Sequence, residues 1–252
     1  MKMLYASILI SLLLFPIHLS GQDTQARHFQ IDFNAIRLKP PFTEDTNLRR
    51  QFQSLAIGFA NRIHDHEYQY DEAFMSKIIQ FITQNSSDKA ALSAKYYLGE
   101  YLLYSWSKFE RIIDVKMVTL IVEDAITVFE AIVAEAPDSW QGKLASHYTH
   151  DFFYTILPDR PALLAARRRI LSTMLQIKDE PGFIELRRYE GVREPIELDI
   201  RAEMIELDLE EKNLAKAEAE LAILKAQYPD SQTIKRLEKK ISERRQRFQG
   251  KE

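Results

Sequence analysis

The stretch NLAKAEAELAILKAQYPDSQ, residues 213–232, decides the fold of this chain because it shows a helix, the end of that helix and the start of the next. Its apolar residues recur at steps of three and four, which places them on one helical face: Leu214, Ala217, Leu221, Leu224 and Tyr228. Asn213 can cap the first turn, and Pro229 ends the run because the residue before a proline leaves the helical region. Asp230 or Ser231 can cap a following helix, so the stretch predicts two helices joined by a tight turn.

This first helix resembles the second helix of a tetratricopeptide repeat. In that family the second helix carries a small alanine, a large apolar residue four positions later and a proline at its exit. Here those residues are Ala217, Leu221 and Pro229. The resemblance implies an all-α fold of stacked antiparallel helical hairpins, a TPR-like α-solenoid.

Two upstream stretches carry parts of the same pattern. Similar second helices begin near Ala73 and near Ala125, the latter with Phe129 and Pro137 at the family spacing. Leu98-Gly99 matches part of the family's first-helix pattern, and glycine inside a helix predicts close approach of a neighbouring helix. The three alanines are unevenly spaced, whereas a regular array keeps a period of about 34 residues. The repeats are therefore expected to be irregular.

The domain boundaries follow from where the helical periodicity starts and stops. Residues 46–249 are predicted to form one helical repeat domain, since each hairpin must stack on its neighbours to bury its apolar face. Residues 22–45 have no helical period and contain Pro40-Pro41, so they are expected to form an extended lead-in. Prolines and glycines in residues 178–195 predict an irregular segment or short helix, and two subdomains meeting there are the alternative.

The N-terminal residues 1–21 have the pattern of a secretory signal peptide. Lys2 precedes an apolar run over residues 4–15, followed by Pro16 and the small pair Ser20-Gly21. The run is shorter than the roughly 20 residues that span a bilayer, although an uncleaved anchor remains the alternative. With no cysteine to accept a lipid, the chain is expected to be periplasmic or secreted and not a lipoprotein.

Composition excludes several other classes of protein. The 252 residues are 46% hydrophobic, which is ordinary for a globular core. A net charge of −3 argues against bulk attraction to nucleic acid or to an anionic membrane. Basic segments at 167–169 and 235–247 are expected to be solvated or capping surfaces of the fold, with a partner-docking arm as the alternative for the last helix.

The resemblance also implies a partner-binding groove lined by the first helix of each hairpin. Its expected lining residues are Tyr96, Glu100, Tyr104, Asp199, Glu206 and Glu210. Such an aromatic and acidic surface favours a basic or amphipathic peptide, with aromatic anchors supplying affinity and acids setting orientation. The alternative is that the tyrosines belong to the core and the acids are ordinary exposed residues.

Catalytic and metal signals are weak. His147 and His150 place two imidazoles about one helical turn apart, with Asp151 beside them, but two ring nitrogens need a third ligand and supporting partners before they make a metal centre. The sequence contains no nucleophile-elbow, phosphate-loop or dinucleotide motif and no cysteine nucleophile. No cofactor is expected, and the chain is expected not to be an enzyme.

Three functions remain as hypotheses. The leading one is an exported TPR-like scaffold that binds a protein or peptide partner, with neither nucleic acid nor a stable membrane anchor. The second is a metal-dependent helical hydrolase or metal-binding protein using His147, His150 and Asp151. The third is a glycan or small-ligand capture protein in which tyrosines stack on the ligand.

Overall fold

The computed structural model describes residues 31, 33–64, 71–109, 115–156 and 160–249. These residues form ten helices and no β-sheet, with one isolated bridge between Thr43 and Asp88. The all-α class is therefore confirmed for the described part of the chain. The predicted signal peptide, residues 1–21, lies outside it. The helices are α2 (Thr46–His64), α3 (Glu72–Gln84), α4 (Lys89–Phe109), α5 (Val115–Glu135), α6 (Trp140–Ile156), α7 (Arg160–Gln176), α8 (Pro181–Tyr189), α9 (Ile196–Glu210), α10 (Leu214–Gln227) and α11 (Gln232–Gln249).

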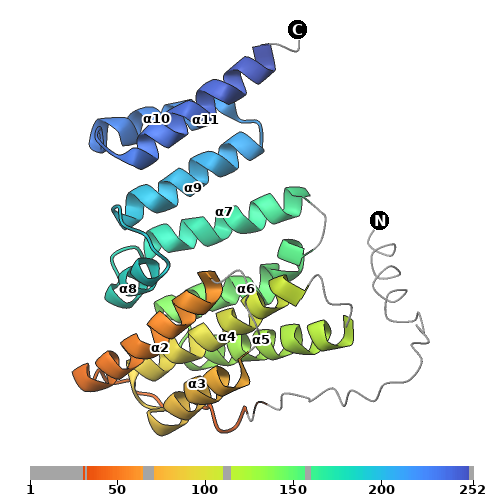
Figure 1. Ribbon diagram of the computed structural model, residues 1–252, viewed down its shortest axis with the longest axis vertical. Helices are drawn as coiled ribbons and strands as arrows, with labels where there is room; N and C mark the ends of the chain where they lie inside the picture. The colour runs from red at the N-terminus through yellow and green to blue at the C-terminus, as the bar shows by residue number, and fades with distance from the viewer. Residues whose placement is uncertain (1–30, 32, 65–70, 110–114, 157–159, 250–252) are drawn as a thin grey trace, which may run out of the picture. The chain divides into compact units, whose positions relative to one another are not determined.

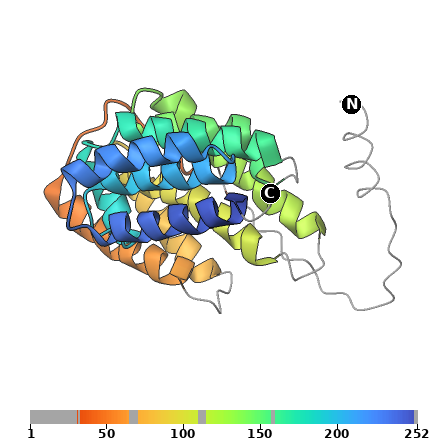
Figure 2. The ribbon, with the colours of Figure 1, turned by 90° about the horizontal axis from the view of Figure 1, so that it is seen from above.

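Helices that follow one another in the chain mostly pack together (Figures 1 and 2). Helix α4 packs against α3 and α5, α5 packs against α6, and α6 against α7. The short α8 interrupts this order because it packs against α2, while α7 packs directly against α9. Helices α9, α10 and α11 all contact one another. The contact between α2 and α8 thus brings together segments that are far apart in the sequence.

The helices begin where the sequence predicts caps. A capping side chain accepts a backbone N–H of the first turn and satisfies a donor that has no partner inside the helix. Four side chains cap helix starts with donor–acceptor distances of 2.7–3.4 Å: Asp45, Asp88 and the predicted caps Asn213 and Ser231. Helix α10 ends at Gln227, two residues before Pro229, as the proline predicts. The segment 178–195 contains the short α8 between irregular stretches.

The described part of the predicted lead-in is packed and does not behave as a free linker. Ile36 and Leu38 belong to the core. The backbone N–H of Lys39 donates to the carbonyl of Ser86 at 2.8 Å, in the turn between α3 and α4. Apolar burial and these hydrogen bonds fix the segment against the helices. The compact unit accordingly begins at Ile31, upstream of the predicted boundary at residue 46, and runs without a further division through residues 178–195.

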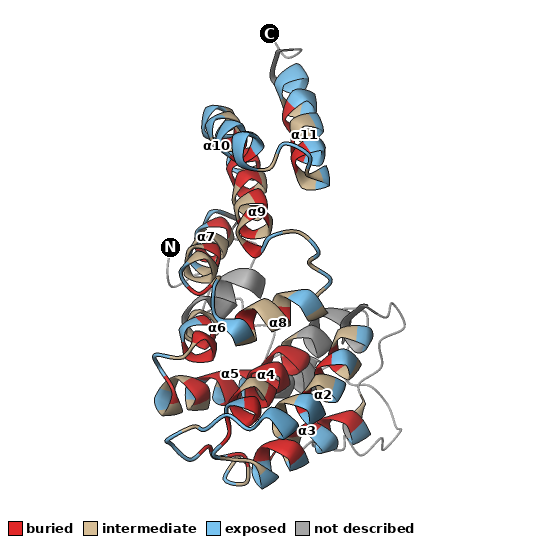
Figure 3. Cartoon of the chain, turned by 90° about the vertical axis from the view of Figure 1, so that its left-hand side faces the viewer, coloured by how far each residue is buried: buried red, intermediate tan, exposed pale blue. Residues whose placement is uncertain are grey.

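Helix α4 is buried on nearly all sides from Ala90 to Leu102, as Figure 3 shows by its red colour. A helix that contacts α2, α3, α5 and α6 has no free face, so its polar residues must find partners inside the protein. Lys95, only 1% exposed, meets this need by placing its Nζ 2.7 Å from Oε2 of Glu135. Gly99 lies against Phe129 of α5, which confirms the predicted close approach of a neighbouring helix.

The alanines of the repeat-like pattern do not share one environment. Ala125 and Ala217 are fully buried, as a small residue at a helix contact should be. Ala73 is exposed, so placing it in the small buried position was wrong, because α3 turns Phe74, Met75 and Ile78 toward the core instead. No described helix is both long enough and apolar enough to cross a membrane.

Candidate functional site

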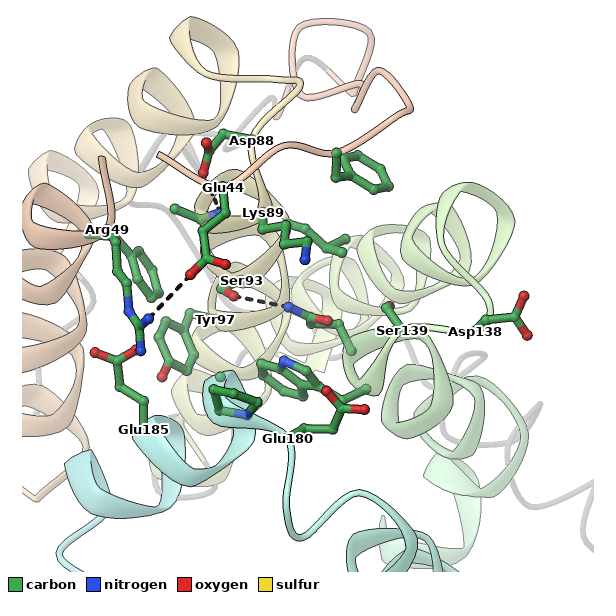
Figure 4. A pocket seen from close by; sticks show the side chains of 18 residues that line it. Glu44, Arg49, Asp88, Lys89, Ser93, Tyr97, Asp138, Ser139, Glu180 and Glu185 are labelled. Carbon is green, nitrogen blue, oxygen red and sulfur yellow. Dashed lines mark hydrogen bonds and ion pairs between the residues drawn. The ribbon is translucent and has the colours of Figure 1, made fainter. Parts of the chain in front are cut away.

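A cavity of about 390 Å³ lies where α2, α8, the start of α4 and the start of α6 meet (Figure 4). Its walls come from distant parts of the sequence, including Phe42 before α2, Arg49 in α2, Ser93 in α4, Trp140 in α6 and Glu185 in α8. Ligand-binding pockets in proteins usually measure about 300–1,000 Å³. The cavity therefore has room for a small molecule or for one or two side chains of a peptide.

Aromatic rings form one wall of the cavity. Phe52 and Tyr97 stack with ring centroids 5.2 Å apart and an interplanar angle of 15°. Trp140 lies against Gly182, where an added Cβ would come within 2.7 Å of the indole Nε1. Glycine at this position allows the start of α8 to approach the ring closely. The wall is thus aromatic and closely packed, and only small parts of its rings are exposed: Phe52 is 5%, Tyr97 3% and Trp140 7% exposed.

An ion-pair network closes the side of the cavity between α2 and α8. Arg49 places Nη1 3.2 Å from Oε1 of Glu44 and Nη2 3.2 Å from Oε2 of Glu185 (Figure 4). Gln53 Nε2 also donates to Glu185 Oε1 at 3.1 Å. The positive charge of Arg49 is therefore compensated by two carboxylates. The same contacts hold α8 against α2.

Three helices begin at the cavity, and two of these starts are capped by side chains of the chain itself. Asp88 accepts the backbone N–H of Ala90 at 2.7 Å through Oδ1 and that of Asp45 at 3.0 Å through Oδ2. Ser139 Oγ accepts the N–H of Gly142 at 3.0 Å. The start of α8 has no side-chain cap, although Glu180 stands at the capping position. The first four N–H groups of α4 thus all have acceptors, and at the start of α6 those of Gly142 and Lys143 do.

The charged side chains of the lining are mostly acidic. Five carboxylates face two cations there: Glu44, Asp88, Asp138, Glu180 and Glu185 against Arg49 and Lys89. Among the described residues, Asp138, Glu180 and Lys89 form no ion pair, and all three are exposed. Figure 4 shows Asp138 pointing away from the other labelled side chains. Glu180, on the α8 side, is thus the uncompensated carboxylate closest to the aromatic wall.

Tyr96 and Glu100 do not line an open groove, and this corrects the prediction for both. They are 1% and 5% exposed, because α4 is covered on all sides. The hydroxyl of Tyr96 donates to Glu100 Oε1 at 2.8 Å, and the hydroxyl of Tyr148 donates to the same oxygen at 3.2 Å. The side chain of Tyr104 lies outside the described residues. The alternative that the tyrosines belong to the core is therefore correct for Tyr96.

Glu100 is a buried acid held largely in its neutral form. Burial, and then repulsion from Glu190, raises the pKa of Glu100 to about 8. Its Oε2 has no hydrogen-bond partner among the described residues. Arg187 Nη1 lies 2.8 Å from Glu190 and carries the compensating charge of this region. Glu100 and its partners are therefore a polar cluster inside the core, and none of them is among the residues that line the cavity.

The three predicted acids of the C-terminal helices are paired with bases of the same chain. Asp199 forms an ion pair with Arg187, Glu206 lies 2.7 Å from Lys240 Nζ, and Glu210 lies 3.1 Å from Arg167 Nη1. The two predicted basic segments thus neutralise Glu206 and Glu210, while Arg187 of α8 neutralises Asp199. This corrects the expectation of a free acidic surface at Asp199, Glu206 and Glu210, since the charges of partners between helices cancel most of its field.

Of the three predicted metal ligands, only His147 has a described side chain. His147 Nε2 lies 2.7 Å from the hydroxyl of Thr173, a contact between α6 and α7. The side chains of His150 and Asp151 lie outside the described residues. No group of three metal-capable side chains occurs among the residues that the structure describes.

The sequence signals for the cavity are local, and the one at Pro181-Gly182 predicts only an irregular segment or a short helix. Asp88 and the Pro181-Gly182 pair each mark the start of a helix. Nothing in the sequence pattern shows that these starts meet Arg49 and Phe52 of α2. The cavity was missed because it depends on the packing of α8 against α2.

Comparisons with known proteins found no matching family model, no matching curated protein and no matching solved structure. The basis for assigning a function is therefore the cavity, its charges and the sequence pattern. The aromatic wall and the acidic rim are the features of the described residues that a ligand would contact.

Proposed function

We propose that this chain is an exported, non-catalytic scaffold of TPR-like helical hairpins that binds a protein or peptide partner in the cavity between α2, α4, α6 and α8. The observation that carries the proposal is the cavity itself, with its aromatic wall and charged rim. Buried aromatic anchors with polar rims supply most of the affinity in peptide recognition. Export rests on the signal-like residues 1–21, and a stacked, solenoid-type arrangement rests on the resemblance.

The hydroxyl groups of the lining support binding over catalysis. Ser93 Oγ accepts a hydrogen bond from Gln141 Nε2 at 3.0 Å, and Ser139 caps α6. Both hydroxyls thus serve the fold, and neither is placed beside a general base in these contacts. A rigid wall held by stacked rings suits recognition of a preformed shape.

Site-specific photocrosslinking in the cells of origin tests the proposal. A benzophenone amino acid replaces Phe42, which is half-buried at the cavity, and a matched control replaces Ile223, which is 51% exposed on α10. We expect one discrete protein adduct at position 42 and none at position 223. Equal adducts at both positions, or none at position 42, would overturn the assignment of the cavity. N-terminal sequencing of the mature chain tests removal of residues 1–21 separately.

A further inference from the structure

The charged side chains that line the cavity carry a net negative charge. Arg49 is held between Glu44 and Glu185, and both oxygens of Asp88 accept backbone N–H groups. One arginine thus faces two carboxylates, and the whole lining carries five carboxylates against two cations, although Asp138 points away from the other labelled side chains. A recess of low dielectric lined mainly by one sign of charge concentrates ligands of the opposite sign. The charge balance therefore favours a cation.

The aromatic wall favours the same kind of ligand. Trp140, Tyr97 and Phe52 present rings to the cavity. A lysine or arginine side chain buries its aliphatic stem against apolar surface, and its charged head is attracted to aromatic faces. A free inorganic cation lacks the aliphatic stem and would not gain the packing against the wall. The combination selects a cationic group carried on a hydrocarbon stem.

The helix starts at the cavity do not provide an anion site. Helix N-termini attract anions through free N–H groups, but Asp88 and Ser139 already cap α4 and α6. The remaining start, that of α8, has Glu180 at its capping position and Pro181 as its first residue. Proline has no N–H, and the carboxylate of Glu180 repels an approaching anion. The start of α8, which has no side-chain cap, therefore carries a negative charge that disfavours anions.

We propose that the cavity binds a lysine or arginine side chain of a peptide partner. The stem of that side chain packs on the wall formed by Phe52, Tyr97 and Trp140, and its charged head pairs with Glu180. This inference deepens the proposed function and rests on it. It makes the partner a basic peptide or a protein with an exposed basic segment.

Fluorine NMR of the full chain tests the charge of the ligand. The chain has two tryptophans, so incorporation of 5-fluorotryptophan gives two signals, of which Trp140 reports on the cavity. The probes are four blocked tripeptides, acetyl-Ala-X-Ala-amide, with arginine, lysine, norleucine or glutamate at X. We expect saturable shifts of the Trp140 signal with arginine and lysine, in the millimolar range typical of small probes. Norleucine and glutamate should bind at least about five-fold more weakly, a difference typical of one partly exposed charge pair.

Two variants separate the role of Glu180 from a general loss of charge. Glu180→Gln should weaken arginine binding about three- to ten-fold, as loss of one charge-assisted contact predicts. The same change at Glu130, an exposed acid of α5 away from the cavity, is the matched control and should leave binding unchanged. Glu180 makes no capping hydrogen bond, so its substitution should leave the melting temperature unchanged.

Each other outcome overturns the inference in a distinguishable way. Stronger binding of the glutamate peptide would make the cavity an anion site. Equal binding of norleucine and arginine would keep an apolar anchor site and refute the cationic ligand. No shift with any peptide would refute the cationic ligand. A crosslink at position 42 in that case would still support the cavity as the site of a protein partner. If no crosslink forms at position 42 but the arginine peptide still binds, the protein partner is refuted and the cation site is kept.

Discussion

Gly99 of α4 lies in direct contact with Phe129 of α5, so that a Cβ at residue 99 would be 2.7 Å from the ring Cζ. The ring cannot move aside, because it stacks on Tyr148 with centroids 4.7 Å apart and meets Tyr96 edge-on at 5.8 Å. Phe129 is also fully buried. The spacing between these two helices is therefore set by the absence of one methyl group.

Gly99→Ala should destabilise the protein although alanine is the better helix former. The clash with Phe129 costs about 1–3 kcal/mol, which exceeds the gain in helix propensity of about 1 kcal/mol. Chemical denaturation followed by circular dichroism measures the change in the free energy of unfolding. The double variant with Phe129→Leu should recover part of the loss, since leucine leaves room for the methyl group. A stabilised Gly99→Ala variant would contradict the contact.

The buried carboxyl of Glu100 should make stability depend on pH. Its pKa is raised from 4.5 to about 8 in the folded protein, so the unfolded chain releases this proton at lower pH than the folded chain does. The free energy of unfolding from this group is therefore highest below about pH 4.5 and falls as the pH rises to about 8. Glu100→Gln keeps an acceptor for Tyr96 and removes the titration.

The test compares denaturation of the wild type and of Glu100→Gln at several pH values. Relative to wild type, the free energy of unfolding of the variant should rise by on the order of 3 kcal/mol between about pH 5 and about pH 8. Glu130→Gln, an exposed change, should follow the wild-type profile. Parallel profiles for Glu100→Gln and wild type would show that Glu100 does not carry the raised pKa.

Lys212→Gly should stabilise the turn between α9 and α10. Lys212 has a φ of 62°, in the left-handed region, and its N–H donates to Leu209 while that of Asn213 donates to Asp208 at 2.8 Å. This is the helix-ending geometry in which glycine is preferred, because a Cβ costs about 1–2 kcal/mol there. After the extra freedom of glycine in the unfolded chain is subtracted, we expect a gain of about 0.5–1 kcal/mol. Lys212→Ala should show no such gain, and a destabilised glycine variant would contradict the prediction.

Glu194→Ala should loosen the start of α11. Glu194 Oε1 accepts the N–H of Gln232 at 3.1 Å, and Oε2 accepts the hydroxyl of Ser231 at 2.6 Å. Burial alone would raise the pKa of Glu194, but these hydrogen bonds together outweigh it and lower the pKa. The contribution of Glu194 to stability is therefore present above its ordinary pKa and is lost as the pH falls through the lowered value. We expect a loss of about 1 kcal/mol, typical of a helix cap. Hydrogen exchange should accelerate in the first turn of α11 and remain unchanged in α4.

Local features of the fold could be predicted from the sequence. Asp88, Asn213 and Ser231 act on the adjacent turn, so their capping roles depend on residues only a few positions away. The close contact at Gly99 was also predictable, since glycine inside a helix weakens it unless another element needs the space. These predictions are confirmed because each depends only on residues a few positions away in the sequence.

The site could not be predicted in the same way. Helical periodicity gives the face that a residue occupies but not the number of neighbours around the helix, which is why Tyr96 and Glu100 were placed on an open surface. Similarly, the charge of Glu206 can be read from the sequence, whereas its pairing with Lys240 cannot. The cavity depends on three helix starts and on α2, and only the tertiary structure brings them together.

The pairing of α2 with α8 has a consequence for the order of folding. Arg49 and Glu185 are 136 positions apart, whereas most other helix contacts join segments close in sequence. Contacts between near neighbours form fast, while closing a long loop costs entropy that only the completed contact repays. We therefore expect α8 to dock on α2 late in folding. Binding at the cavity would then begin only when folding is complete, so that partially folded chains cannot capture the partner.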